Sequence, residues 1–241
     1  AIGKGKNNPF DAFKTPKELE KEAKEKKMNP YMLTSFVDGS KTMIEMAALA
    51  NYLDFGIDID GMHGPNSTYD ELNSIFIPKS SGGILENTNV VDFAFGVAPG
   101  VFAIVYSEDD YVNYEMEYLK MGKGPYWTLY RPYHLTSLEI PRTIMKLMVE
   151  KETQLSAKKW NVEVVAHSKK DLKAGTNLGS IGGENIYGKA MRVENSKNLA
   201  PLGIAENNIV NSEVKKGEPI EIENINITDN QLYKYWLSQN S

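Results

Sequence analysis

A change of sequence texture near residues 155–161 limits what this chain can fold into more than any other feature. Before it, long helical stretches such as residues 40–53 alternate with strand-like runs. After it, a strand-like run at 162–166 leads into short apolar pieces separated by glycines, at 175, 179, 182, 183, 188, 203 and 217. We therefore predict an α+β protein, with a mixed α/β domain over residues 1–158 and a small β-rich domain over 159–241.

The composition excludes several classes of function. The 241 residues contain no cysteine, which rules out disulfides and cysteine-based metal or nucleophile chemistry and suits a reducing cytoplasm, where we expect the protein. A net charge of -5 argues against a nucleic-acid partner. No apolar stretch approaches the roughly 20 residues of a membrane span, so we expect no membrane partner. The three histidines have no metal-ligand spacing, and we predict no metal site.

The first residues predict a polar loop over 3–9 that could bind an anion. Lys4, Lys6 and Asn8 supply charged and amide donors in a glycine-containing stretch. The spacing is not that of a Walker loop, and no Gly-x-Gly-x-x-Gly dinucleotide fingerprint is present. The chain starts without methionine, in what resembles the end of a strand, and we expect it to be a piece of a longer protein.

The strongest candidate for catalysis is the start of the predicted helix over residues 40–53. A period of 3.6 residues places Asp38, Lys41 and Glu45 on one face. A lysine between two carboxylates can orient a substrate hydroxyl, move its proton and stabilise negative charge on an oxygen. The alternative is an ordinary surface pair of lysine and glutamate, worth a few tenths of a kcal/mol.

Two further residues are candidates for substrate binding. His63 lies in a loop between Gly61 and Gly64, where a ligand can approach the backbone closely, although an exposed or cap-forming histidine fits the same sequence. Arg131 could grip a carboxylate or phosphate with two parallel hydrogen bonds. It could equally stack on Tyr130 or Tyr133.

Two parts of the chain resemble known families. Residues 3–9, 36–47 and 61–65 resemble the catalytic domain of homoserine-dehydrogenase-like proteins, and within them the 1-deoxy-D-xylulose 5-phosphate reductoisomerase-like enzymes. Residues 164–220, around the segments Asp171-Leu172-Lys173-Ala174-Gly175 and Lys216-Gly217-Glu218-Pro219, resemble a SAF domain, a β-clip-like module.

The resemblance implies an oxidoreductase whose NAD(P)-binding Rossmann domain precedes residue 1. Hydride would pass between NADP or NAD and a small hydroxy or keto substrate, phosphorylated or acidic. Asp38, Lys41 and Glu45 would be the catalytic counterparts, with Lys4, Lys6 and Asn8 at the junction of cofactor and substrate. We expect a homo-oligomer, with the aromatic segment 106–135 as a contact surface.

A different class of function stays open at this point. The chain could be a non-catalytic protein that binds a carbohydrate or a partner through the SAF-like module. A sugar-acid lyase or dehydratase is disfavoured, because clusters of metal ligands are missing from the sequence.

Overall fold

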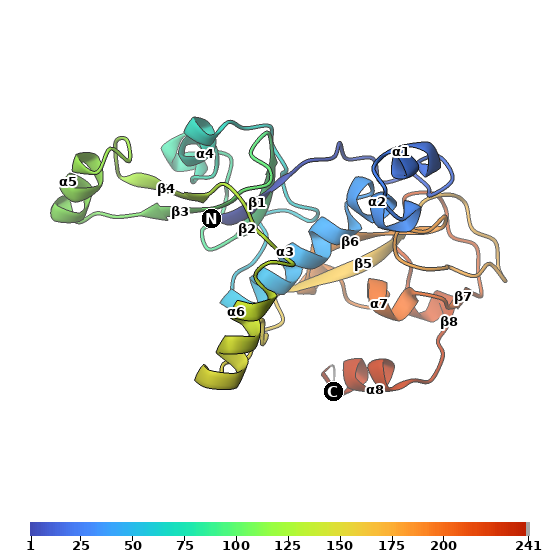
Figure 1. The fold of residues 1–241 in the computed structure, drawn as a ribbon. Helices are drawn as coiled ribbons and strands as arrows, with labels where there is room; N and C mark the ends of the chain where they lie inside the picture. The colour runs from blue at the N-terminus through green and yellow to red at the C-terminus, as the bar shows by residue number, and fades with distance from the viewer. Residues whose placement is uncertain (240–241) are drawn as a thin grey trace. The chain divides into compact units, whose positions relative to one another are not determined.

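The computed structural model describes residues 1–239 and confirms the α+β class. The chain forms two compact units, each built from two separate segments (Figure 1). Ala1–Asn7 and Ala48–Asn161 make the first, here called the sheet unit. Asn8–Ala47 and the residues from Val162 onward make the second, called the C-terminal unit.

A four-stranded mixed sheet organises the sheet unit. Its strand order is β2-β1-β3-β4, so the first strand of the chain lies inside the sheet. β1 (Ile2–Lys6) runs parallel to β2 (Val91–Phe95) and antiparallel to β3 (Val101–Tyr106). β4 (Tyr126–Arg131) pairs antiparallel with β3. The first strand therefore finds both of its partners about ninety or more residues later in the chain.

The prediction of a polar loop over residues 3–9 was wrong for the part that forms β1. Lysine and glycine alternate there with the period of a strand. The glycines serve close packing, because a Cβ on Gly3 would lie 2.5 Å from the Asp92 carbonyl oxygen and from the Phe102 ring. A Cβ on Gly5 would lie 2.3 Å from the Ala98 backbone nitrogen.

One face of the sheet is covered by short helical turns that close the core. They are η1 (Tyr69–Glu71), α4 (Leu72–Ile75) and η2 (Lys79–Ser81). The core that they close contains aliphatic and aromatic side chains from these turns and from alternate strand positions: Leu72, Phe76, Leu85, Ala94, Phe102 and Ile104. Alternation along the strands leaves the other face for Lys4, Phe93 and Val101.

Three longer helical segments belong wholly or partly to the sheet unit. α3 (Ser40–Leu53) confirms the predicted helix and enters this unit at Ala48. α5 (Asp110–Tyr118) lies at the tip of the hairpin of β3 and β4 (Figure 1). α6 (Ile140–Met145) continues into one π-helical turn, η3 (Lys146–Glu150), where the sequence predicts a helix over residues 137–152.

The C-terminal unit combines helices from the first segment with short strands from the second. Its helices are α1 (Glu20–Glu25), α2 (Pro30–Val37), α7 (Leu202–Ala205) and α8 (Gln231–Gln239), with 3-10 turns η4 (Val193–Asn195) and η5 (Ile222–Asn224). Its strands form two antiparallel pairs, β5 (Val162–Ser168) with β6 (Ile186–Arg192) and β7 (Ile209–Val210) with β8 (Ile225–Asn226).

The two units contain different residues from the two domains, divided at residue 158, that the sequence predicts. Residues 8–47 belong to the same unit as the chain from Val162 onward, and not to the sheet unit. The physical reason lies in contacts between residues 8–47 and the second segment. The rings of Phe13 and Tyr187 lie 5.9 Å apart, and the Gly188 backbone N–H donates to Ser40 Oγ at 2.8 Å. The SAF-like assignment of residues 159–241 stays a prediction.

A buried ion pair joins the two segments of the C-terminal unit. Lys169 Nζ lies 2.8 Å from Asp38 Oδ2, and both side chains are almost fully buried. The same ammonium donates hydrogen bonds to the carbonyl oxygens of Lys14, at 2.7 Å, and Gly183, at 2.8 Å. Asp38 also accepts a hydrogen bond from the backbone N–H of Ser40 at 2.9 Å. Burial lowers the pKa of Lys169, and the charge of Asp38 opposes that shift.

Replacing Lys169 with methionine is expected to lower the free energy of unfolding by about 3–5 kcal/mol, because Asp38 is left as an unpaired buried charge. Urea denaturation followed by circular dichroism measures the loss. Adding Asp38→Leu to the same variant should recover part of the loss, since the lone buried charge is then removed. Lys41→Met, at a side chain that is 45% exposed, is the matched control. A loss below about 1 kcal/mol for Lys169→Met, the range of surface pairs, would contradict the expected role of the buried pair.

Candidate functional site

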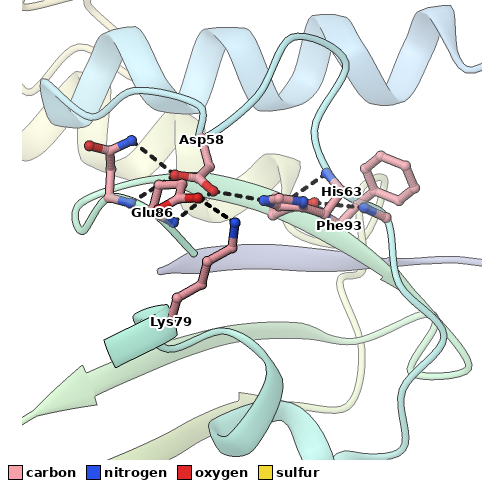
Figure 2. Close-up of polar contacts among 8 residues, drawn as sticks. Asp58, His63, Lys79, Glu86 and Phe93 are labelled. Carbon is pink, nitrogen blue, oxygen red and sulfur yellow. Dashed lines mark hydrogen bonds and ion pairs between the residues drawn. The ribbon is translucent and has the colours of Figure 1, made fainter. Parts of the chain in front are cut away.

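A histidine and an aspartate form a close pair in the loop that follows α3. His63 Nε2 lies 2.8 Å from Asp58 Oδ2, and the Asp58 side chain is fully buried while that of His63 is 18% exposed (Figure 2). Because a carboxylate accepts hydrogen bonds, it holds the neutral imidazole with its proton on Nε2. Nδ1 is then the basic nitrogen, and it makes no hydrogen bond to residues 1–239.

Asp58 is held rigidly by donors from a second loop. Its carboxylate accepts hydrogen bonds from the backbone N–H groups of Glu86, at 3.0 Å, and Asn87, at 2.8 Å, and from the Asn87 side chain, at 3.0 Å. Burial alone would raise the pKa of Asp58, but these hydrogen bonds and the nearby His63 lower it below its ordinary value. The aspartate therefore stays ionised and can stabilise a protonated His63.

A second buried carboxylate fixes the backbone of the same loop against the sheet. Asp92, on β2, accepts hydrogen bonds from the backbone N–H groups of His63, at 3.1 Å, and Gly64, at 3.0 Å. Burial raises the pKa of Asp92, and the hydrogen bonds from Gly64, Phe93 and His63 oppose that shift. The Phe93 ring packs against Gly64, where a Cβ would lie 2.4 Å from it. His63 is thus positioned through its side chain and its main chain.

The Lys79–Glu86 ion pair borders this site on the solvent side (Figure 2). Both side chains are more than half exposed. The hydrogen bond to Glu86 raises the pKa of Lys79. Since Glu86 donates its backbone N–H to Asp58, the pair lies next to the aspartate that holds His63.

Two of the predicted anion-binding residues share one row across the sheet. Lys4 pairs with Phe93 on one side and Val101 on the other, and Val101 pairs with Arg131. Directly paired residues have side chains on the same face, so Lys4 and Arg131 lie on one face, about 10 Å apart at two strand spacings. Lys6, two residues after Lys4, belongs to the same face and is 5% exposed.

Arg131 is anchored by an acidic and an aromatic neighbour. Its guanidinium pairs with Glu139 and lies 4.8 Å from the centroid of the Tyr133 ring, which is the stacked alternative considered from the sequence. The hydrogen bond to Glu139 raises the pKa of Arg131. The arginine also lines a cavity of about 240 Å³ with Glu139, Arg142, Thr143, Lys146 and Gln154.

The three residues predicted as catalytic lie in the C-terminal unit, and the structure separates Asp38 from the other two. Asp38 precedes α3 and is buried against Lys169. Lys41 lies 3.9 Å from Glu45, with both side chains at least a third exposed, and 4.5 Å from the centroid of the Phe36 ring. Asn8 also belongs to this unit and is half-buried. Their assignment as catalytic or binding residues stays a prediction.

Comparison with known families identifies the first part of the chain. Residues 1–140 match the family described as oxidoreductase DRL, catalytic domain. The chain belongs to this family. The match includes the whole His63 site, the row of Lys4 and Arg131, and the residues of α3. No curated protein was found to match the chain.

Membership of the DRL family makes this an oxidoreductase catalytic domain. Within residues 1–239, His, Asp and Glu side chains form no group of three or more that could hold a metal ion. Over the same residues, every helix is too short or too polar to cross a membrane.

Sequence reasoning selects His63 as a candidate for substrate binding but misses the two aspartates that position it. Asp58 lies only five residues before His63, which is a signal that the sequence does contain. Asp92 lies within a strand of otherwise apolar residues, Val91–Phe95. A lone carboxylate inside such a strand indicates a specific hydrogen-bonding role, because burying an unpaired charge is costly.

The Asp58→Asn variant is expected to be less stable than the wild type at neutral pH and equally stable in acid. The pKa of Asp58 is lowered on folding, so its charge stabilises the fold fully above the ordinary carboxyl pKa of about 4. That contribution is lost as the pH falls through the lower pKa of the folded protein. Melting temperatures of both proteins across an acid pH series measure it. Asp70→Asn, at an exposed residue of η1, serves as control. A stability difference that is the same at every pH would refute the electrostatic origin.

Proposed function

We propose that this DRL-family domain catalyses hydride transfer between NADP or NAD and a small hydroxy or keto substrate that carries a phosphate or carboxylate. The observation that carries the proposal is the oriented His63–Asp58 pair in the same unit as the cationic row of Lys4 and Arg131. The His63–Asp58 pair suits proton transfer at an oxygen, and the Lys4–Arg131 row suits the binding of an anionic group.

His63 is the residue best placed to move a proton. When a hydroxyl carbon is oxidised, the hydroxyl proton must leave, and Nδ1 of the neutral imidazole can accept it. The resulting imidazolium is stabilised by the buried Asp58 charge at 2.8 Å. In the reverse direction the same nitrogen returns the proton to the carbonyl oxygen.

Lys4 and Arg131 would bind the anionic end of the substrate. Lys4 presents a point charge from the sheet, and Arg131 has five N–H donors, of which Glu139 engages one side. Their separation of about 10 Å at the backbone leaves room for a small substrate between the two long side chains. Lys6 adds positive charge along the same strand.

A dinucleotide cradle does not fit the residues of this chain. The glycines of β1 resemble those of a phosphate-binding loop, but the space beside them is occupied by Asp92, Phe102 and Ala98. Over the described residues the sheet has one parallel strand pair, β1 with β2, and its other pairings are antiparallel, whereas a dinucleotide binds to a sheet of several parallel strands. We therefore propose that the nicotinamide cofactor binds mainly to a domain outside these 241 residues.

Isothermal titration of the 241-residue chain with NADPH is expected to show no tight binding. The reason is the packing that occupies the glycine positions of β1. A protein that includes the cofactor domain should bind the same ligand. Tight binding by the chain alone would show that its own residues form the cofactor site.

His63→Gln is expected to lower kcat by about 10²–10⁴-fold with little change in KM, since it removes the proton-transfer group. Lys4→Ala and Arg131→Ala should instead raise KM about 10–100-fold, as expected for the loss of a charged hydrogen bond. NADPH absorbance in the protein with its cofactor domain measures both constants. Lys24→Ala, at an exposed lysine of α1, is the matched control.

The same assay separates His63 from the catalytic residues predicted from the sequence. If Lys41→Ala abolishes turnover and His63→Gln does not, the α3 residues carry the chemistry and the assignment to His63 is wrong. Arg131→Lys gives a further check, because a lysine keeps the charge but loses the planar fork that binds a phosphate or carboxylate.

A further inference from the structure

A cavity of about 430 Å³ lies in the sheet unit beside the start of β1. Four aromatic rings, those of Phe55, Phe76, Tyr106 and Tyr126, contribute to its wall. Most of the remaining wall is aliphatic, and no acidic or basic side chain of residues 1–239 lines it. Sites for small molecules have volumes of about 300–1,000 Å³ and mainly apolar linings, so this cavity has the size and character of such a site.

The cavity reaches from the surface to the hydrophobic core. Among the side chains that line it, Val105 and Tyr106 are 38% and 53% exposed, whereas Phe76 and Leu85 are almost fully buried. An apolar molecule seated there would cover the exposed part of the wall and contact the buried part. Removal of both apolar surfaces from water favours binding.

A few polar groups at the cavity can orient a ligand. The side chains of Thr88 and Asn89 are exposed, and the described part of the chain offers them no hydrogen-bond partner. Of the described lining groups, the charged one is the Ala1 amine, which donates a hydrogen bond to the Ile104 carbonyl oxygen at 3.1 Å. Aromatic walls with two neutral polar side chains suit an uncharged ring that carries a hydrogen-bonding atom.

The segment of residues 85–89 connects this cavity with the site of His63. Its first residue and its last two residues line the cavity. The two residues between them, Glu86 and Asn87, donate their backbone N–H groups to Asp58 at 3.0 Å and 2.8 Å (Figure 2). A molecule that orders this segment therefore also acts on the hydrogen bonds that hold Asp58.

We propose that the cavity binds a small uncharged aromatic molecule, and that its occupant changes the surroundings of His63 through residues 85–89. Binding and the hydrogen bonds to Asp58 depend on the conformation of the same five residues, so the two are linked. The cavity shares no lining residue with the row of Lys4 and Arg131. Neither the binding nor its effect on His63 requires the proposed reaction.

Titration with indole, a planar uncharged ring with one N–H donor, tests the site, and nuclear magnetic resonance measures the Kd. Thr88→Trp places a ring in the cavity and should raise the Kd about tenfold or more. Thr153→Trp, at an exposed threonine outside the lining, is the matched control and should leave it unchanged.

A second pair of variants removes a ring instead of adding one. Tyr106→Ala should raise the Kd about two- to tenfold, because indole loses one aromatic contact. Tyr111→Ala, at an exposed tyrosine of α5 that does not line the cavity, should have no effect. Circular dichroism checks that each variant folds.

The three histidines of the chain report the effect at His63 without turnover. Indole should shift the ring signals of His63, which are assigned with His63→Gln. The signals of His134 and His167, neither of which lines the cavity, should stay in place. The His63 shift should be lost in Thr88→Trp.

Three results would overturn the proposal. Indole that does not bind, or that binds Thr88→Trp and Tyr106→Ala as tightly as the wild type, would show that the cavity is not its site. Binding without a shift at His63 would refute the link through residues 85–89. Loss of binding in a protein that includes residues before Ala1 would show that those residues fill the cavity.

Discussion

The position of His63 depends on two carboxylates that are buried beside the sheet and accept several hydrogen bonds there. Asp58 accepts hydrogen bonds from two loops, and Asp92 accepts them from three backbone N–H groups. An uncompensated buried charge would cost several kcal/mol, so these loops have little freedom to adopt other conformations. The imidazole of His63 is thereby fixed in orientation and in tautomer through hydrogen bonds.

In the C-terminal unit, a buried charged group is likewise held by specific partners, here in the ion pair of Asp38 and Lys169. Asp38 and Lys169 bring a helix-preceding turn and the end of a strand together, and the lysine also satisfies two backbone carbonyl groups. Buried ion pairs add little net stability over apolar residues of the same shape, but a broken one is costly. Their effect is therefore to specify one arrangement of the segments.

The elements with a strong local signal could be predicted from the sequence, and those defined by distant partners could not. The helix at residues 40–53 consists of good helix formers, and its bounds agree with α3. β1 was interpreted as a loop because its glycines and lysines have low strand propensity, and its partners lie on β2 and β3. Helical periodicity placed Asp38 beside Lys41, whereas Asp38 ends the preceding helix and is buried. His63 and Arg131 are candidates because of their residue types, but the contacts that orient them come from Asp92 and Glu139, which periodicity does not reveal.

The division of each unit between two chain segments has a consequence for how the protein is made. β1 is synthesised before β2 and β3 and cannot pair with them until residues 91–106 have followed. The C-terminal unit forms later still, because residues 8–47 belong to one unit with residues from Val162 onward. Closing such long loops costs entropy and slows folding, so most of this stretch of chain must leave the ribosome before either core can close. The two lysines and two glycines of β1 make this strand less apolar. Its tendency to aggregate before it pairs with β2 and β3 is therefore lower.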